Sequence, residues 1–221
     1  MKLITLFLVV GMFAVSGWTE QKTTYSLELE KRAEAGDAEG QANLGLCYYK
    51  GEGVTHDIKE AVKWLMKAAE QGNAEGQYGL GNCYDFGEGI KQDKGKAVEL
   101  FTKSAEQGNA DAQYALRNYY CLKADEYIRT PDNLPRIEEA RKMAKEWCLK
   151  AAEGGNRHAQ RTLGHDYFYN THSKGAERIK ELEESKKWYL KAQEQGDSDV
   201  EKMVRLCELK IQKEQRQLKT K

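Results

Sequence analysis

The 221-residue sequence contains little proline and has no excess of either charge. Only two prolines occur, and Lys+Arg and Asp+Glu are equal at 35 each. A neutral chain without a basic run lacks the positive surface that attracts a phosphate backbone, so we expect no nucleic-acid partner. Scarce proline beside abundant Lys, Glu, Ala and Leu favours helices that each expose one polar face.

The motifs that bind metals or nucleotides, or that catalyse reactions, are also missing. There is no HExxH or CxxC pair, no acidic calcium loop and no GxSxG turn. The segment Gly51-Glu52-Gly53 follows an expected helix, whereas a phosphate-binding loop follows a strand. His158 and His165 lie two helical turns apart, about 10 Å along the axis, and cannot share one metal ion. We therefore expect no cofactor, no bound metal and no enzymatic activity.

One apolar run stands at the start of the chain. It extends from Leu3 to Val15, follows Met1-Lys2, and ends in the small residues Ala14-Val15-Ser16. This is the pattern of a secretory signal peptide, and its apolar core is short for a membrane span. We expect cleavage near Ser16-Gly17, which makes the mature chain periplasmic or secreted and leaves it no membrane span. An uncleaved anchor is the alternative.

An internal repeat organises the rest of the chain. Gly36, Gly72 and Gly108 are spaced by 36 residues, and Gly155 and Gly196 continue the series at 47 and 41. The residues that keep register behind these glycines are Leu44, Leu80, Leu116, Leu163 and Val204, then Tyr48, Tyr84, Tyr120 and Tyr167. In the second half of the unit the matching residues are Trp64, Leu100, Trp147 and Trp188. A period of this length is the signature of a repeat array.

Each repeat is predicted to contain two helices. The first runs from about Ala38 to Lys50 and ends at Gly51-Glu52-Gly53-Val54, where glycine permits the left-handed conformation of a helix stop. Asp57 precedes the second helix, and Glu60 three residues later predicts a reciprocal capping box. One helix pair cannot bury its own apolar face, so adjacent pairs must stack.

The second helix of the first repeat is expected to point Ala61, Trp64, Leu65 and Ala68 inward. Glycines inside the first helices lower helix stability, so their presence indicates a close approach of the neighbouring helix, opposite the Ala-Ala pairs. These glycines are Gly45, Gly81 and Gly164.

The repeat resembles a known family. Residues 42–72 read A-x-x-L-G-x-x-Y-x-x-G-x-G-V-x-x-D-x-x-x-A-x-x-W-x-x-x-A-A-x-x-G, which is similar to the Sel1-like repeat, a relative of the tetratricopeptide repeat. The resemblance covers roughly residues 25–207 and implies an all-α fold, a right-handed α-solenoid of stacked helix-turn-helix repeats. In the third repeat Arg117 replaces the helix glycine and Lys123–Pro135 forms an insertion. The fourth repeat has residues 170–175 in place of the G-x-G-V turn.

The expected domain organisation follows the repeat register. It comprises a signal peptide (1–16), an N-terminal capping helix (17–36), Sel1-like repeats at 37–72, 73–108, 109–155 (with the insertion) and 156–196, and a C-terminal capping helix (197–221). The capping helices present a polar outer face, which a repeat array needs for solubility.

Five cysteines are an odd number for an exported chain, so at least one is expected to be a free thiol or to pair between chains. Cys47, Cys83 and Cys207 hold the same repeat position, on stacked helices about 8–10 Å apart, which is too far for a disulfide. We expect them to be small buried hydrophobic residues. Cys121 and Cys148 lie on the two helices of the third repeat, where a bridge between them stays open as an alternative.

The binding surface is predicted from the resemblance and from helical spacing. In tetratricopeptide-like solenoids the first helices line the concave face. On the first helices of repeats two to four, the positions that share a face away from the core include Tyr, Asn, Arg and His, which are residues suited to interfaces. The predicted peptide- or protein-binding residues are Tyr78, Asn82, Tyr114, Asn118, Arg161 and His165. The alternative is that the two tyrosines only pack between neighbouring first helices.

These observations predict an exported helical-repeat scaffold that binds another protein or a peptide through its concave face. A structural or regulatory subunit of a cell-envelope complex is an alternative. A β-lactam- or cell-wall-directed hydrolase is a weaker one, because the secreted relatives linked to β-lactams carry paired cysteines in the inter-repeat loop. Here that loop, residues 69–76, contains none.

Overall fold

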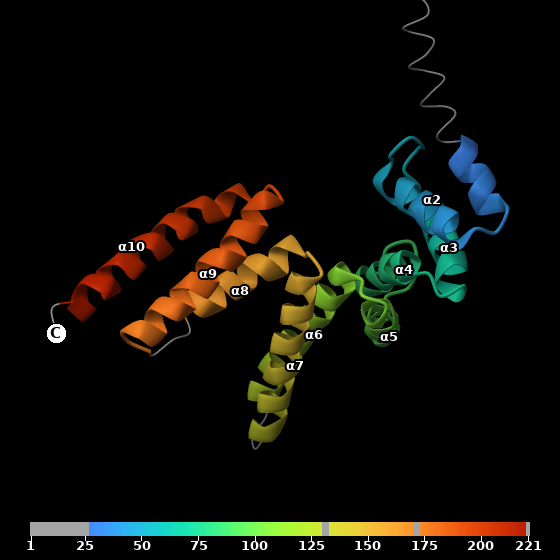
Figure 1. Ribbon diagram of the computed structural model, residues 1–221. Coiled ribbons are helices and arrows are strands. Elements are labelled where there is room, and N and C mark those ends of the chain that lie inside the picture. Colours follow the sequence, from blue (N-terminus) through green and yellow to red (C-terminus); the bar gives the residue numbers. More distant parts are fainter. Residues whose placement is uncertain (1–26, 130–132, 170–172, 220–221) are drawn as a thin grey trace, which may run out of the picture. The chain divides into compact units, whose positions relative to one another are not determined.

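The computed structural model describes residues 27–129, 133–169 and 173–219, so the predicted signal peptide lies outside the described residues. The chain divides into two compact units, Met1–Ser104 and Ala105–Lys221, which are considered separately (Figure 1). Over the described residues the chain forms helices and no strands. The predicted all-α fold of stacked helix pairs is thereby confirmed.

The first unit begins with a helix over residues 27–34, inside the predicted capping segment. The elements that follow are α2 (Ala38–Lys50), α3 (Ile58–Glu70), α4 (Ala74–Phe86) and α5 (Lys94–Glu106), the last ending two residues beyond the unit. Helix α2 packs against α3 and α4, and α3 also packs against α4. The first helix of the first repeat therefore has the predicted bounds, Ala38 to Lys50.

Most helices of the second unit are longer than those of the first. The elements of the second unit are α6 (Ala110–Ile128), α7 (Leu134–Glu153), α8 (Arg157–Tyr169), α9 (Ala176–Glu194), the 3-10 turn η1 (Ser198–Val200) and α10 (Glu201–Lys219). Helix α7 packs against α6 and α8, and α9 packs against α8 and α10. The predicted insertion, Lys123–Pro135, mostly lengthens α6 and α7, with Pro135 in the first turn of α7, where its missing N–H has no helical partner to lose.

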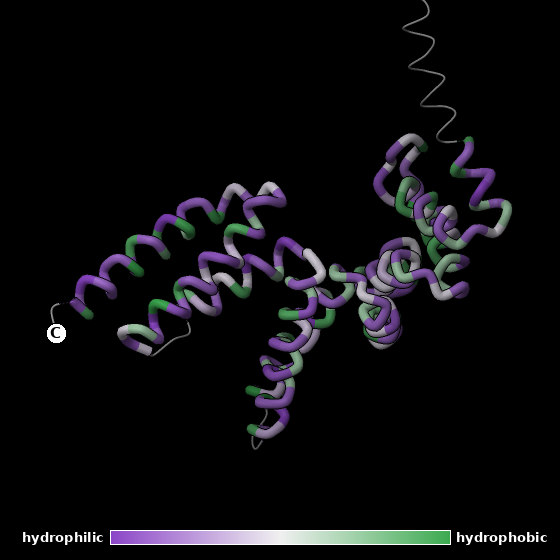
Figure 2. Tube along the Cα trace, viewed as in Figure 1, coloured by the Kyte–Doolittle hydropathy of each residue, from purple (hydrophilic) through white to green (hydrophobic). Residues whose placement is uncertain are grey.

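The core is built from residues at the repeated positions, and hydrophobic residues recur along each helix among hydrophilic ones (Figure 2). The four register leucines Leu44, Leu80, Leu116 and Leu163 are buried, as predicted, whereas Val204 is half-buried. Ala61, Leu65 and Ala68 are fully buried. Trp64 is partly buried and packs against the cluster of Leu29, Ala33 and Leu44, as predicted, with the Lys67 ammonium 4.0 Å from its ring centre.

The helix glycines bring the two helices of a repeat into close contact. A Cβ atom added to Gly81 would lie 2.6 Å from Cε1 of Phe101, and one added to Gly164 would lie 2.6 Å from Cε1 of Tyr189. On Gly45 it would lie 2.8 Å from Cγ of Leu65. The predicted close approach is therefore confirmed, but the contacted group is a large side chain of the second helix rather than the Ala-Ala pair.

Only the Asp57 side of the predicted capping box of α3 forms. Oδ1 of Asp57 accepts hydrogen bonds from the backbone N–H groups of Lys59 (2.9 Å) and Glu60 (3.1 Å). The reciprocal bond of a capping box is absent, because the Asp57 N–H donates to the Tyr48 carbonyl at 3.0 Å and Glu60 pairs with Lys63. This backbone bond ties the start of the second helix to the first helix.

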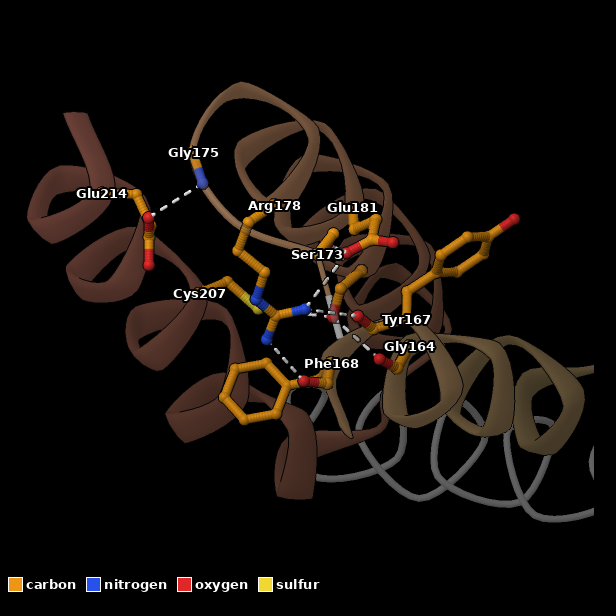
Figure 3. A network of polar contacts seen from close by, with 10 residues as sticks. Gly164, Tyr167, Phe168, Ser173, Gly175, Arg178, Glu181, Cys207 and Glu214 are labelled. Carbon is orange, nitrogen blue, oxygen red and sulfur yellow. Dashed lines mark hydrogen bonds and ion pairs between the residues drawn. The ribbon is translucent and has the colours of Figure 1, made fainter. Parts of the chain in front are cut away.

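An arginine caps the end of the first helix in the fourth repeat, where the sequence lacks the G-x-G-V turn. Arg178 reaches from α9 to the end of α8, where its Nη2 donates to the Phe168 carbonyl at 2.7 Å and its Nη1 to the Tyr167 carbonyl at 3.3 Å (Figure 3). The last carbonyls of a helix have no intrahelical donor. The guanidinium supplies one here, and it also pairs with Glu181 at 3.5 Å.

A buried glutamine near the start of the first helix links repeats one, three and four to the helix before them. Its Nε2 donates to the carbonyl of an alanine eight residues earlier. The bonds are Gln41 to Ala33 (3.1 Å), Gln113 to Ala105 (3.1 Å) and Gln160 to Ala152 (3.0 Å). These glutamines thus satisfy carbonyls near the end of the preceding helix, which would otherwise be buried without a donor.

The Oε1 atom of this glutamine accepts a hydrogen bond in repeats one and four. Nε2 of Gln71 donates to Oε1 of Gln41 at 2.7 Å, and Nε2 of Gln195 donates to Oε1 of Gln160 at 2.8 Å. In repeat three the position of Gln71 and Gln195 is occupied by Gly154, and Oε1 of Gln113 is buried without a hydrogen-bond partner among the described residues. The third repeat has therefore lost one link of this chain of amides.

Replacement of these glutamines by methionine should expose the difference. Gln160→Met removes two hydrogen bonds, while Gln113→Met removes one and also deletes a buried unpaired oxygen. We expect Gln160→Met to lower the free energy of unfolding by about 1 kcal/mol more than Gln113→Met does. Urea denaturation of the two variants measures this, and equal losses would contradict the assignment of the amide link.

Candidate functional site

Tyr114 is a predicted site residue of the second unit. It lies on α6 and is half-buried, and its ring stacks on that of His158 from α8, with centroids 6.0 Å apart and planes 28° apart. It also packs against the core cluster that contains Leu163 and Trp188. Tyr114 is thus a packing residue that borders an exposed histidine.

His158 begins a row along one side of α8, which we call the α8 row: His158, Arg161, His165 and Tyr169. Their spacing of three or four residues places them on one helix face. The His165 ring stacks on Tyr169 with centroids 5.9 Å apart, and its Nδ1 lies 3.1 Å from the Tyr189 hydroxyl. His158, His165 and Tyr169 are exposed, with 63% of Tyr169 accessible. Sequence reasoning missed Tyr169, although its position one turn after His165 could have revealed it.

Arg161 is half-exposed and has an intramolecular task. Its Nη1 lies 3.3 Å from Oδ2 of Asp197 and 3.7 Å from Oδ2 of Asp199. Asp197 is buried and its Oδ1 caps η1 by accepting a hydrogen bond from the Asp199 N–H. Arg161 therefore balances the charge of a buried carboxylate, in addition to its place in the α8 row.

The other predicted residues also have partners inside the chain. Tyr78, on α4 of the first unit, is half-buried with its ring centroid 6.0 Å from that of Phe101. Asn82 lies one turn further along α4 and is half-buried. Asn118 of the second unit is exposed and accepts a hydrogen bond from Nη1 of Arg117 at 3.0 Å. The structure brings Tyr114 to the α8 row, while Tyr78 and Asn82 belong to the first unit.

The third repeat reverses the size pattern of the others. Arg117 stands at the position of the helix glycines, and Cys148 stands at the position that Phe101 and Tyr189 hold in repeats two and four. A long side chain on the first helix thus faces a small one on the second. Both residues line a pocket of about 700 Å³ in the second unit.

The pocket lies among α6, α7, α8 and the first turns of α9. Its apolar lining consists of Cys121, Ala144, Cys148, Leu149 and Leu163, with Tyr167 beside them. Its charged lining consists of Arg117, Arg141, Lys142 and Lys145 as cations and of Glu146, Asp166 and Glu181 as carboxylates. None of the six predicted site residues lines the pocket. The pocket was not predicted, because the sequence pattern alone did not show which residue faces Arg117.

The cysteines of the pocket do not form an activated nucleophile. Cys121 and Cys148 are both free thiols, so the alternative of a bridge between them is not realised in the structure. Burial raises the pKa of Cys148 to about 11, against the opposing effect of the neighbouring Arg117 guanidinium. A thiol with this pKa stays protonated near neutral pH and is a poor nucleophile.

Two further properties concern the described residues alone. No group of three or more His, Cys, Asp or Glu side chains among them is arranged to hold a metal ion. None of the helices described is both long enough and apolar enough to cross a membrane.

Comparison with known proteins identifies the repeats. The model of the Sel1 repeat matches residues 38–73, 74–109, 136–156 and 158–197, more than half of the chain. The chain belongs to the Sel1 repeat family. The match leaves out α6, the first helix of repeat three, where Arg117 replaces the glycine. Sel1 repeats form helical scaffolds that typically mediate protein interactions, and the family is generally non-catalytic.

Two solved structures are similar to this chain. A Sel1 repeat protein from Oxalobacter formigenes is 26% identical with a TM-score of 0.58, and the match covers 77% of this chain and 63% of that one. The chain thus spans about 63% of that protein's length. A protective antigen of uropathogenic Escherichia coli with an SLR fold is 27% identical, with a TM-score of 0.43 and coverage of 81% and 50%. A search of curated proteins found no match.

Removal of Arg161 should test its structural task. Arg161→Ala leaves the buried carboxylate of Asp197 without its cation, and we expect a loss of about 1–3 kcal/mol in the free energy of unfolding. Asp199→Ala is the control, because Asp199 is exposed and should change stability little. Chemical denaturation at neutral pH measures both, and a silent Arg161→Ala would assign Arg161 to the surface alone.

Proposed function

We propose that this Sel1 repeat protein is an exported scaffold that binds a protein or peptide partner through the exposed faces of its first helices. The observation that carries the proposal is the α8 row, in which two exposed histidines and an exposed tyrosine lie on one helix face next to Tyr114. The likeness to tetratricopeptide repeats supports the concave face as the location of this surface.

The chemistry of the α8 row suits an interface. Tyrosine contributes a large contact area with few rotatable bonds, and histidine can donate or accept hydrogen bonds. The stacking of His165 on Tyr169 and of Tyr114 on His158 restricts these rings before a partner arrives. Less conformational entropy is then lost on binding. Asn118 in the same unit, and Tyr78 with Asn82 in the first unit, belong to the same proposal.

Export is proposed on the sequence of the first residues. The apolar run from Leu3 to Val15, with small residues at its end, supports delivery to the periplasm or the medium. Cell fractionation followed by amino-terminal sequencing is the direct check on this part of the proposal. The hydrolase alternative has no observation in its favour, since the pocket thiol Cys148 is buried and its pKa is raised by that burial.

The binding proposal is tested by capture and reconstitution. A partner recovered on the immobilised protein from an envelope extract is identified, purified and titrated calorimetrically against the wild type and against His158→Ala combined with Tyr169→Ala. We expect the double variant to bind at least about tenfold more weakly, with an unchanged melting temperature, because both side chains are exposed.

The matched control removes a histidine and a large apolar residue elsewhere on the surface. His56→Ala with Leu209→Ala fits, because both residues are exposed and neither belongs to the α8 row or to the other proposed binding residues. The control should bind like the wild type. An α8-row variant that also binds like the wild type would exclude this surface as the site.

A further inference from the structure

The pocket beside Arg117 has a surplus of positive charge that the fold does not use. Of its carboxylates, Glu181 pairs with Arg178 at 3.5 Å. Burial raises the pKa of the Asp166 carboxyl, and the neighbouring Arg117 and Lys145 oppose this effect. Two further cations on its wall, Arg141 and Lys142 of α7, are exposed and make no ion pair with any described residue. They are available to an incoming negative charge.

The floor of the pocket is apolar. Cys148 and Leu163 are buried at its base, while Leu149 and Tyr167 are partly exposed, at 41% and 37%. The volume of about 700 Å³ falls within the roughly 300–1,000 Å³ typical of ligand sites. Reduced access of water to such a floor strengthens the attraction between a guanidinium and a carboxylate. The pocket therefore combines cations with apolar contacts.

The position of Arg117 explains how the third repeat forms this site. In repeats two and four a phenylalanine or tyrosine lies against the helix glycine. The small Cys148 leaves that space empty, and Arg117 places a guanidinium at its edge. A guanidinium can bind a carboxylate through two parallel hydrogen bonds.

We propose that the pocket of Arg117, Arg141, Lys142 and Cys148 binds an acidic side chain, flanked by an apolar residue, from the partner protein. This inference rests on the proposed function, because it assigns chemistry to the partner. A protein source is favoured over a free carboxylate by the partly exposed Leu149 and Tyr167, which offer contacts to residues next to the acid. The zero net charge of the chain, with Lys+Arg and Asp+Glu equal at 35 each, disfavours a phosphate backbone.

The probe is the peptide acetyl-Leu-Glu-Leu-amide, titrated into the isotopically labelled full chain and followed by backbone amide shifts in NMR spectra. We expect saturable shifts at Ala144 and Leu163, and binding at least about tenfold weaker for acetyl-Leu-Gln-Leu-amide, which lacks the charge. Arg141→Gln with Lys142→Gln should remove most of that preference. Lys202→Gln with Lys213→Gln, two exposed cations of α10 that do not line the pocket, is the matched control and should retain it.

Three results would overturn the proposal: no shift at the pocket amides, equal binding of the two peptides, or a preference unaffected by Arg141→Gln with Lys142→Gln. Free glutarate binding as tightly as the Glu peptide would overturn the protein source. Failure of the proposed function is distinguishable from failure of the pocket proposal. If an identified partner loses affinity for the α8-row variant but not for the Arg141/Lys142 variant, the scaffold function stands and the pocket proposal falls.

Discussion

The contact between a glycine on one helix and a large side chain on the next is the constraint on which the rest of the structure depends. Because Gly45, Gly81 and Gly164 have no Cβ, the second helix of the repeat can approach the first closely enough for Leu65, Phe101 or Tyr189 to fill the space. This approach lets a buried core form from helices that are otherwise rich in charge. Each glycine costs helix stability of about 1 kcal/mol relative to alanine, which the packing offsets.

The third repeat lacks this glycine contact, and a pocket lies at the corresponding position. Arg117 and Cys148 exchange the small and the large partner, and Gly154 removes the glutamine that would satisfy Gln113. Residues 123–128 of the insertion extend α6, and residues 134 and 135 begin α7. These changes occur together around one pocket. The repeat has therefore given up part of the regular packing of its neighbours, and the result is an open, positively charged cavity.

The parts of the structure that the sequence predicted are those set by local rules. The bounds of α2 follow from Asp37 before it and Gly51 after it, and the same code recurs at each regular repeat. Arg178 could not be predicted as the donor to the end of α8, because the bond joins side chain and backbone of different helices. The sequence showed Arg117 only as a departure from the repeat pattern. The pocket became apparent from the structure, in which Cys148 lies opposite Arg117.

The exchange of Arg117 and Cys148 is tested most directly by a double-mutant cycle of thermodynamic stability. Cys148→Leu alone crowds the arginine, and Arg117→Gly alone enlarges the cavity and adds a helix glycine. Together they restore the pattern of the first repeat, Gly45 against Leu65. The account predicts that each single change destabilises the protein and that the pair recovers at least about 1 kcal/mol relative to their sum. Additive losses would show that the two residues do not replace the glycine contact.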